Sequence, residues 1–399
     1  MKLKKPQVLM YFVNAFFWMS IYTYVPMFPQ YVNGLVSETF PLGMVATVTG
    51  IITGAYGVTQ MLLRLPLGIL SDQLKRRKPF ILAGIAAGTA SALLMFFVGT
   101  PAAMFVGRLM AGLCACAYVQ VSVLFASYYE DRHTTKSLGF VEGSTATGQL
   151  TAVVLGGLAG SLMGDKRYAF LMAAALGVVG FALALMTVES RKERKAVRLR
   201  DIGVTLSEKT LIVASVLAIF TLAINFGKAF VFSLIAAEAF KVTELQKSLL
   251  TVLVILPTAL FSPLTGSRLI PRFGTRAVVA AGFVLQAVSC AMAPFTGHIA
   301  WLYLSQFITG MGYSLTFPSL MALSVSKMPD EKRATAMGFY QAVYGIGIFA
   351  GPWLTGWLTD LLGQNLAFFL NAGMALLAAA GAVVFIAATA GRRAVASFQ

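Results

Sequence analysis

The sequence predicts an all-α integral membrane protein, with twelve transmembrane helices arranged as two pseudo-symmetric six-helix bundles. Three observations carry this prediction. Of the 399 residues, 58% are hydrophobic and only 12% are charged, whereas a typical soluble domain has about 25% charged residues. Long apolar runs alternate with short polar breaks, and the second half of the chain repeats positions of the first.

The apolar runs are each long enough to cross a bilayer as a helix. The hydrocarbon core, about 30 Å thick, needs about 20 apolar residues in a helix, because every backbone polar group must be hydrogen-bonded within the segment. The first run follows a basic start, but it is longer than a signal-peptide core and no small-residue cleavage site follows, so we interpret it as a membrane helix. The expected spans are residues 8–30, 42–66, 79–99, 102–127, 139–163, 168–188, 210–237, 246–267, 276–296, 300–326, 335–361 and 366–390.

Lysine and arginine residues are distributed unevenly among the breaks. With an even number of spans both termini lie on one side, and cytoplasmic breaks carry the excess of Lys and Arg. Of the 31 basic residues, 24 fall at the termini and in the even-numbered breaks, four in the odd-numbered breaks and three within spans. We therefore expect a multi-pass protein of the cell (inner) membrane with both termini in the cytoplasm.

Other functional classes have little support. The net charge of +16 could suggest nucleic acid, but the basic residues are not interleaved with stacking aromatics, so no nucleic-acid partner is expected. Cys114, Cys116 and Cys290 lie within apolar runs, and His133 and His298 are isolated on opposite sides. Because the sequence has neither metal-ligand spacing nor an acid–base cluster, we predict no metal, no cofactor and no enzyme activity.

The longest polar segment, residues 189–209, divides the chain almost in half. We interpret it as a cytoplasmic linker between an N-terminal bundle, residues 1–188, and a C-terminal bundle, residues 210–399. The halves share residues at a constant offset of 199: Gly148 and Gly347, Gly157 and Gly356, Leu70 and Leu269, and Arg77 and Arg276. Chance could give one such match, but several at one offset favour an internal repeat, which is expected of two similar bundles around a central path.

The break after the second span, GILSDQLKRRKPF (residues 68–80), concentrates charge between two apolar runs. Its pattern G-x-L-x-D-x-x-x-R-R resembles the signature loop of the major facilitator superfamily. The residues that carry the resemblance are Gly68, Leu70, Asp72, Arg76 and Arg77. The family usually has Gly where this chain has Lys75.

A degenerate second copy of the loop, SRLIPRFGTR (residues 267–276), follows the eighth span. It has the family's Gly as Gly274 but replaces the Asp with Pro271. The resemblance covers the whole chain, since it includes the twelve spans, the cytoplasmic termini and the basic linker. It identifies a family and says almost nothing about the substrate.

The resemblance implies a secondary transporter whose two bundles rock about a midplane site and open alternately to each side. Asp72 would then accept hydrogen bonds at a neighbouring helix N-terminus, and Arg76 and Arg77 would pair with acids, which would hold the cytoplasmic side shut. The alternative is that this loop only sets the topology. That alternative suits Lys75 and Lys78 better than Asp72, because acids contribute little to orientation.

Two further matches to the family are weaker. In span four, Arg108 followed by Gly112 resembles the family's buried Arg and Gly, although Ala111 stands where Gln is common.

Exporters that exchange drugs for protons typically carry G-x-x-x-G-P-x-x-G-G in span five, where only Gly148 fits here and Gln149 takes the Pro position. The better copy, GIFAGPWLTG with Gly347, Gly351 and Pro352, lies in span eleven. We expect these residues and Gly112 to pack helices together. The placement of the better copy in span eleven disfavours drug–proton exchange without excluding it.

Charged residues within the spans need an explanation, since each costs about 2.5 to 3.5 kcal/mol on insertion scales. Arg64 lies near the cytoplasmic end of span two, from which its side chain can reach the headgroups. Glu142 forms a polar stripe with Thr145 and Gln149, which favours a wall facing protein or water. Two roles stay open for Glu142: an ion pair with Arg64 or Lys136, and a buried carboxylate that carries a proton.

Arg108 and Lys228 lie near the middle of spans four and seven, and Thr221, Asn225 and Lys228 share one helical face. In the family, spans one, four, seven and ten line the central cavity, so the resemblance places both cations there. The alternative is that they extend to the outer headgroups. Two cations in the cavity would favour an anionic substrate.

Spans one and ten add polar and aromatic groups that could bind a small ligand. Asn14 and Tyr313 are the candidates for hydrogen bonding and stacking. Tyr22 and Tyr24 lie close enough to the outer end to serve as interfacial anchors instead.

The leading hypothesis is therefore a proton-linked secondary transporter of a small solute, such as an organic anion, that acts as a monomer among membrane lipids. The alternative is an exporter of amphipathic drugs or lipids by proton antiport, which the aromatic-rich, weakly charged spans favour. A membrane-embedded enzyme, a pore or a sensor has no distinguishing feature in the sequence. The expected partners are the solute and a proton or another coupling ion.

Overall fold

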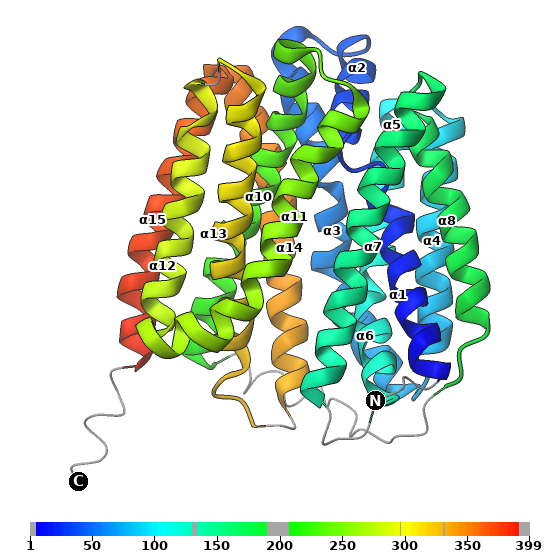
Figure 1. Ribbon diagram of the computed structural model, residues 1–399, viewed down its shortest axis with the longest axis vertical. Helices are drawn as coiled ribbons and strands as arrows, with labels where there is room; N and C mark the ends of the chain where they lie inside the picture. The colour runs from blue at the N-terminus through cyan, green and yellow to red at the C-terminus, as the bar shows by residue number, and fades with distance from the viewer. Residues whose placement is uncertain (1–4, 130–133, 190–206, 296, 330–331, 391–399) are drawn as a thin grey trace.

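The computed structural model describes residues 5–129, 134–189, 207–295, 297–329 and 332–390. Within these ranges every regular element is a helix, and most helices run along the long axis of the molecule (Figure 1). Eight helical stretches of the described residues are long and apolar enough to cross a membrane. The predicted all-α membrane fold is therefore confirmed.

Each of the twelve predicted spans coincides with a helix or with two consecutive helices. In the first half these are α1 (Lys5–Tyr22), α2 (Phe28–Ser37), η1 (Leu42–Met44), α3 (Val45–Gln73), α4 (Lys78–Phe97), α5 (Pro101–Cys116), α6 (Tyr118–Ser127), α7 (Thr134–Met163) and α8 (Tyr168–Leu185). In the second half they are α10 (Lys209–Phe240), α11 (Glu244–Leu264), η3 (Thr265–Leu269), α12 (Ile270–Ala291), η4 (Ala293–Phe295), α13 (Ile299–Val325), α14 (Arg333–Leu362) and α15 (Gln364–Ala390).

Two spans are interrupted. The first is divided between α1 and α2 by a turn in which the backbone N–H groups of Val25 and Met27 donate to the carbonyls of Tyr22 and Tyr24. The fourth is divided at Ala117, which lies between α5 and α6. At both breaks the backbone departs from regular helical hydrogen bonding. The breaks lie inside the bundle, where neighbouring helices surround the polar backbone groups.

Residues 68–80, which we call the signature stretch, were predicted to form a loop, but most of them are helical. Helix α3 continues through Gly68 and Asp72 to Gln73, and only residues 74–77 leave the helix. Lys75 ends it, since its backbone has a φ of 53°, in the left-handed region. The charged residues of this segment favoured a loop in the prediction. A helix that extends beyond the membrane can, however, carry charged residues in its last turns.

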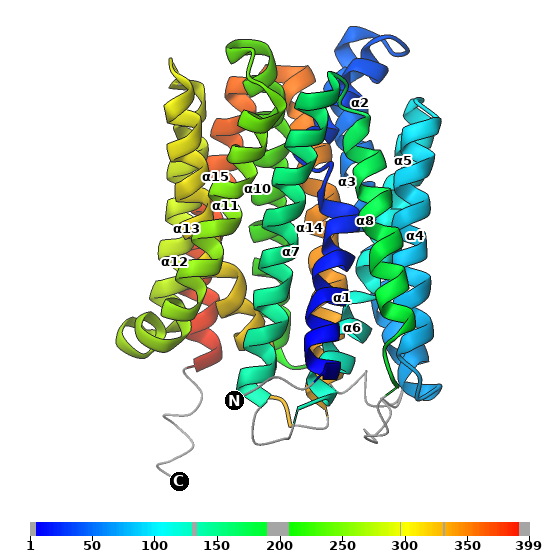
Figure 2. The same cartoon turned by 45° about the vertical axis from the view of Figure 1, so that its right-hand side comes forward.

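Most of the predicted linker, residues 190–206, lies outside the described residues, and Lys209 already belongs to α10. Helices α1 to α8 pack on one another, as do α10 to α15. The two sets meet mainly where α3 packs on α14 and where α7 packs on α11 (Figures 1 and 2). We call the end where α1 begins and α15 ends the terminal end, and the other the opposite end.

Glycines allow α3 and α14 to approach closely toward the opposite end. A Cβ atom on Gly50 would lie 2.2 Å from the Pro352 carbonyl oxygen, and one on Gly54 would lie 2.6 Å from the Phe349 carbonyl oxygen. These separations are too short for any side chain, so the two backbones touch directly. The halves are therefore packed shut along this part of the interface.

The glycines predicted to pack helices also lie at close contacts. A Cβ atom on Gly112 would be 2.5 Å from the Tyr56 carbonyl oxygen on α3. On α14, Cβ atoms on Gly347 and Gly351 would each be 2.3 Å from a carbonyl oxygen of α10. Pro352 lies inside α14 and is buried.

Candidate functional site

Arg108 is buried within the first half. Its Nε and Nη2 atoms both donate to the Thr53 carbonyl oxygen on α3, at 3.2 Å each. The guanidinium also lies over the rings of Phe28 and Tyr56, at 5.0 and 4.6 Å from their centroids. With 5% of the residue exposed, Arg108 does not extend to the headgroups, and it faces backbone and aromatic rings in this conformation.

Lys228 is completely buried within the second half. Its Nζ atom donates to the carbonyl and hydroxyl oxygens of Ser305, at 3.2 and 2.8 Å, and to the hydroxyl of Thr309. The ring of Phe232 lies 4.5 Å away. Lys228 therefore does not reach the headgroups either, and its partners are neutral.

The two predicted amide groups lie in different surroundings. Asn14 is fully buried, and its Nδ2 donates to the Val141 carbonyl, the Ser144 hydroxyl and the Thr145 hydroxyl at 3.1, 2.7 and 3.0 Å. It thus joins α1 to α7. Asn225 is half-buried on α10.

Arg64 was expected to extend toward the headgroups, and this expectation is wrong. Only 3% of the residue is exposed. Its Nη1 donates to Gln60 at 2.8 Å and to the Tyr344 hydroxyl of the other half at 2.7 Å, while its Nη2 donates to the Ala115 carbonyl at 3.1 Å. Arg64 therefore joins the two halves deep within the bundle.

Glu142 lies on α7, and its side chain is exposed. The Tyr118 hydroxyl donates to its Oε1 at 3.2 Å and lies 3.3 Å from the Thr145 hydroxyl. The predicted pair with Arg64 is absent from the described residues, because Arg64 binds neutral oxygens, and the Lys136 side chain lies outside them. Glu142 is thus an exposed carboxylate that, among the described residues, accepts a hydrogen bond from one phenol.

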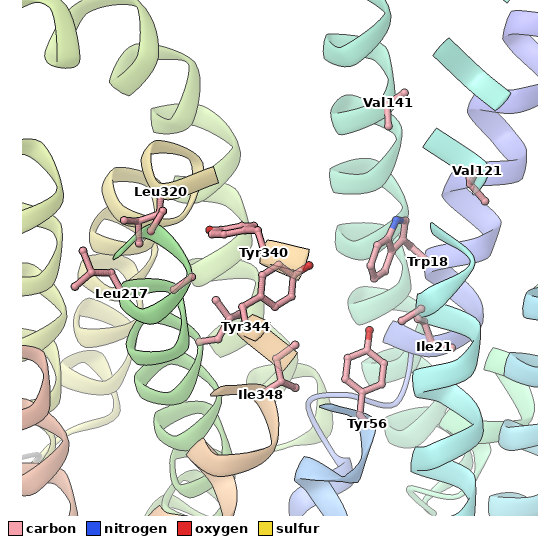
Figure 3. Packing of buried hydrophobic residues seen from close by; sticks show 14 of the residues in the cluster. Trp18, Ile21, Tyr56, Val121, Val141, Leu217, Leu320, Tyr340, Tyr344 and Ile348 are labelled. Atoms are coloured by element: carbon pink, nitrogen blue, oxygen red, sulfur yellow. The ribbon is translucent and has the colours of Figure 1, made fainter. Parts of the chain in front are cut away.

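Aromatic rings of both halves lie near Glu142, with Tyr118 in the first half and Tyr313 and Tyr344 in the second, and we call this group of residues the central region. From the first half, the Trp18 ring lies 5.4 Å from that of Tyr22 and 5.1 Å from that of Tyr118. From the second half, Tyr313 stacks on Phe317 at 5.1 Å, and the ring centroids of Tyr340 and Tyr344 are 5.5 Å apart. Figure 3 shows Tyr340 and Tyr344 on one side and Trp18 and Tyr56 on the other, and all four belong to one cluster of buried residues.

The sequence reasoning found Glu142 and Tyr313 but missed Trp18, Tyr118, Tyr340 and Tyr344. A signal for the last two exists, since residues four apart lie on one helical face. Aromatic pairs at this spacing are equally common in ordinary helix cores, however, so the spacing alone does not mark a site.

At the terminal end, several described contacts of the signature stretch lie within the first half. Arg77 pairs with Asp72 and donates from Nη1 to the Ser71 hydroxyl at 2.7 Å. The Glu189 carboxylate accepts from the backbone N–H groups of Arg77 and Lys78, at 2.8 and 2.9 Å. The described ion-pair partner of Asp72 is therefore Arg77, the residue just before α4, and the implied role of Asp72 at a helix N-terminus stays a prediction. Gly68 has open space around it, and Arg76 is exposed.

At the opposite end, a carboxylate joins the two halves. Asp360, near the end of α14, accepts from the backbone N–H of Ala46 at 3.1 Å, and from the N–H and hydroxyl of Thr47 at 2.7 and 2.6 Å. These groups lie in the first turn of α3, which has the positive end of the helix dipole. Nearby, Lys247 of α11 binds Gln30 of α2.

A comparison with known protein families identifies the class of protein to which the chain belongs. The model of the Major Facilitator Superfamily matches residues 8–234 and, a second time, residues 211–398. The chain therefore belongs to the Major Facilitator Superfamily of membrane transporters, and its function is transport of a small solute.

Similar proteins include the class H tetracycline resistance protein of Pasteurella multocida, 22% identical over 83% of this chain and 83% of that protein. An uncharacterized MFS-type transporter of Methanocaldococcus jannaschii is 22% identical over 81% of this chain and 84% of that protein. Among solved structures, a POT family peptide transporter has a TM-score of 0.79 at 14% identity, over 96% of this chain and 97% of that one. The human organic anion transporter has a TM-score of 0.68 at 17% identity, over 95% and 100%.

Proposed function

We propose that the protein exports amphipathic aromatic compounds in exchange for protons. Its two halves, residues 1–188 and 210–399, would open the central region alternately to the two sides of the membrane, and the terminal end would face the cytoplasm. The observation that carries this proposal is the exposed Glu142 carboxylate among aromatic rings of both halves.

The chemistry of the central region supports such a solute. A flat apolar compound would stack on rings such as Trp18, Tyr313 and Tyr344, and a cationic group on it would bind both the ring faces and the Glu142 carboxylate. Since one carboxylate can hold either a proton or the cationic group, the two would compete for Glu142. Competition at one site is sufficient to couple the flow of the solute to that of protons.

The organic-anion hypothesis has weaker support. It depended on Arg108 and Lys228 facing the cavity, and both cations are bound to neutral oxygens within their own halves. The resemblance in sequence to tetracycline resistance proteins also supports export of an aromatic compound. The span-five motif of drug exporters is incomplete, so Glu142 rather than that motif would provide the coupling.

A direct test is efflux of the fluorescent cation ethidium from vesicles that contain the purified protein. With an imposed proton gradient, we expect saturable ethidium movement against its own gradient and a matching proton flux in the opposite direction. Benzoate, an aromatic anion, serves as the comparison under the same gradient. Proton-coupled movement of benzoate without any movement of ethidium would support the anion hypothesis and exclude this one.

Asp360 and Asp72 lie at the two ends of the α3 and α14 pair, and we expect their substitution to shift the conformational equilibrium in opposite directions. Asp360 binds the first turn of α3 in this conformation, whereas Asp72 would bind the first turn of α14 when the terminal end closes. We expect Asp360→Asn to favour opening of the opposite end and Asp72→Asn to favour the present conformation. Both variants should insert normally and transport about two- to fivefold more slowly, because a helix-end charge contributes about 0.3 to 1 kcal/mol.

The reporter for this pair of variants is a cysteine at Ser248, which is buried where α11 meets Gly157 of α7. In a background with the three native cysteines replaced by alanine, maleimide labelling should rise for Asp360→Asn and fall for Asp72→Asn. Normal transport by Asp72→Asn would reduce the signature stretch to a topology signal. A labelling change of the same sign in both variants would contradict the paired arrangement.

A further inference from the structure

A groove lies on the first half at the terminal end, between the start of α1 and the residues that follow α8. Figure 2 shows both segments at that end. The volume of the groove is about 540 Å³, within the range of about 300 to 1,000 Å³ that is usual for small-ligand sites. We call it the α1–α8 groove, and its walls include Lys5, Val8, Leu9, Phe12, Met186 and Val188.

The groove forms because α1 and α8 approach each other closely only further from the terminal end. A Cβ atom on Gly180 of α8 would lie 3.0 Å from the Phe16 Cβ atom of α1. Toward the terminal end α8 stops at Leu185, and the next residue, Met186, is 67% exposed. The small residue thus holds the two helices together inside the bundle, and the chain beyond it leaves the groove open.

The groove opens away from the central region. Trp18 of α1 packs against Tyr118 of that region, with their ring centroids 5.1 Å apart. Leu9 precedes Trp18 by two and a half helical turns, so it lies on the opposite face of α1. Helices α7 and α8 cover the sides of α1 but leave Phe12 50% exposed. The groove therefore lies on the outer surface of the bundle, which faces lipid in a membrane protein.

The edge of the groove has positive charge. Lys5 is exposed and forms no ion pair with the described residues. The Nζ atom of Lys78 donates to the carbonyl oxygens of Leu185 and Thr187 at 2.7 Å each, on either side of Met186. Two ammonium groups thus lie beside apolar walls, which is the arrangement that an amphipathic anion requires.

The polar groups of opposite character near the groove are bound within the protein. The carboxylate of Glu189 accepts from the backbone N–H groups of Arg77 and Lys78, at 2.8 and 2.9 Å, at the start of α4. Tyr128, which also lines the groove, donates its hydroxyl to the Val188 carbonyl. Neither group binds Lys5, whose ammonium is therefore available to a ligand.

We propose that the α1–α8 groove binds an anionic phospholipid. One acyl chain lies against Val8 and Phe12, where it covers apolar surface that is exposed in the protein alone. The phosphate pairs with the ammonium of Lys5. The proposed topology places the terminal end on the cytoplasmic side, where 24 of the 31 basic residues are expected and where anionic lipids attract them.

The test compares brominated phosphatidylglycerol with brominated phosphatidylcholine, because bromine on a lipid quenches the fluorescence of a nearby tryptophan. The full-length protein carries Met186→Trp as the reporter, with its four native tryptophans replaced by phenylalanine. It is placed in phosphatidylcholine vesicles that contain an increasing share of either brominated lipid. We expect phosphatidylglycerol to bind about fivefold more strongly, since one lysine at an anionic surface contributes about that factor.

The variant Lys5→Gln should remove this preference for the anionic lipid. Its matched control is Lys209→Gln, which removes the same charge from the exposed start of α10, away from the groove. That control should keep the preference. Equal quenching by the two lipids before any lysine is replaced, or equal loss of the preference in both lysine variants, would contradict a specific lipid site.

Inorganic phosphate is a third probe, and it separates a lipid from a free anion. Without an acyl chain it lacks the apolar contacts, so it should leave the preference unchanged at the concentration of the brominated lipid. Loss of the preference under those conditions would show a site for free phosphate and overturn the lipid assignment.

A second measurement avoids the tryptophan replacements. In detergent, the native protein should unfold at a higher temperature with phosphatidylglycerol than with phosphatidylcholine of the same acyl chains, because a ligand of the folded state stabilises it. Lys5→Gln should reduce this difference and Lys209→Gln should not. Equal unfolding temperatures of the native protein with the two lipids would exclude the site. Neither measurement uses transport, so the result is independent of the proposed export function.

Discussion

Replacing Glu142 by glutamine is expected to reduce proton-driven ethidium export at least about tenfold, since an amide neither takes up a proton nor carries the negative charge that attracts a cation. The fold should be retained, because the Glu142 side chain is exposed and its hydrogen-bond partner among the described residues is the Tyr118 hydroxyl. A glutamine can still accept that hydrogen bond. The measurement is ethidium efflux from vesicles at several external pH values.

The matched control for this variant is Glu38→Gln, which removes an exposed carboxylate just after α2. Its transport should equal that of the native protein. Glu142→Gln should also lose most of the pH dependence of export, whereas a variant that is merely destabilised would keep its pH profile at a lower amplitude. An unchanged pH profile with normal export would remove Glu142 from the proposed coupling.

The second large effect is expected at the glycine contact between α3 and α14. Gly54→Leu would place a Cβ atom 2.6 Å from the Phe349 carbonyl oxygen and 3.1 Å from its Cα, so the two backbones must separate. Overpacking of this kind costs about 1 to 3 kcal/mol, which shifts an equilibrium about five- to 150-fold away from the conformation closed at the opposite end. Transport should fall accordingly.

This effect can be measured with the Ser248 cysteine reporter, whose labelling should increase in Gly54→Leu. The control is Gly373→Leu, a glycine on α15 with no atom within 4 Å of its added Cβ. That variant should label and transport like the native protein. If Gly54→Leu leaves labelling low, α3 and α14 can accommodate the side chain without parting, and close backbone contact is not what holds this end shut.

Much of the fold could be predicted from the sequence because membrane helices need long apolar runs. The twelve spans agree with the helices to within a few residues at most ends, and the largest differences are at the end of α2 and, equally, at the end of α3. There Gly68 and Asp72 were assigned to a loop because charge ends a hydrophobic run, although hydrogen bonding within a helix does not stop at the membrane surface.

The site was less predictable because its geometry depends on residues far apart in the chain. Glu142 was found from a polar stripe along one helix, which is a local signal. Arg64 was misjudged because its partners, Tyr344 and the Ala115 carbonyl, come from other helices. Arg108 and Lys228 were predicted to face the central cavity, with extension to the headgroups as the alternative. Their described partners are backbone and hydroxyl oxygens, which leave no recognisable pattern in the sequence.

The antiparallel pair of α3 and α14 has a thermodynamic consequence. Asp72 lies in the last turn of α3 and Asp360 in the last turn of α14, so each acid is near the negative end of its own helix dipole, where an anion is disfavoured. Contact with the positive end of the other helix would relieve this unfavourable interaction for each acid. Rocking of the halves can form only one of the two contacts at a time. The gain at one end would then offset the loss at the other, so that the two conformations would stay close in free energy. A bound proton or solute, which contributes only a few kcal/mol, is then sufficient to decide between them.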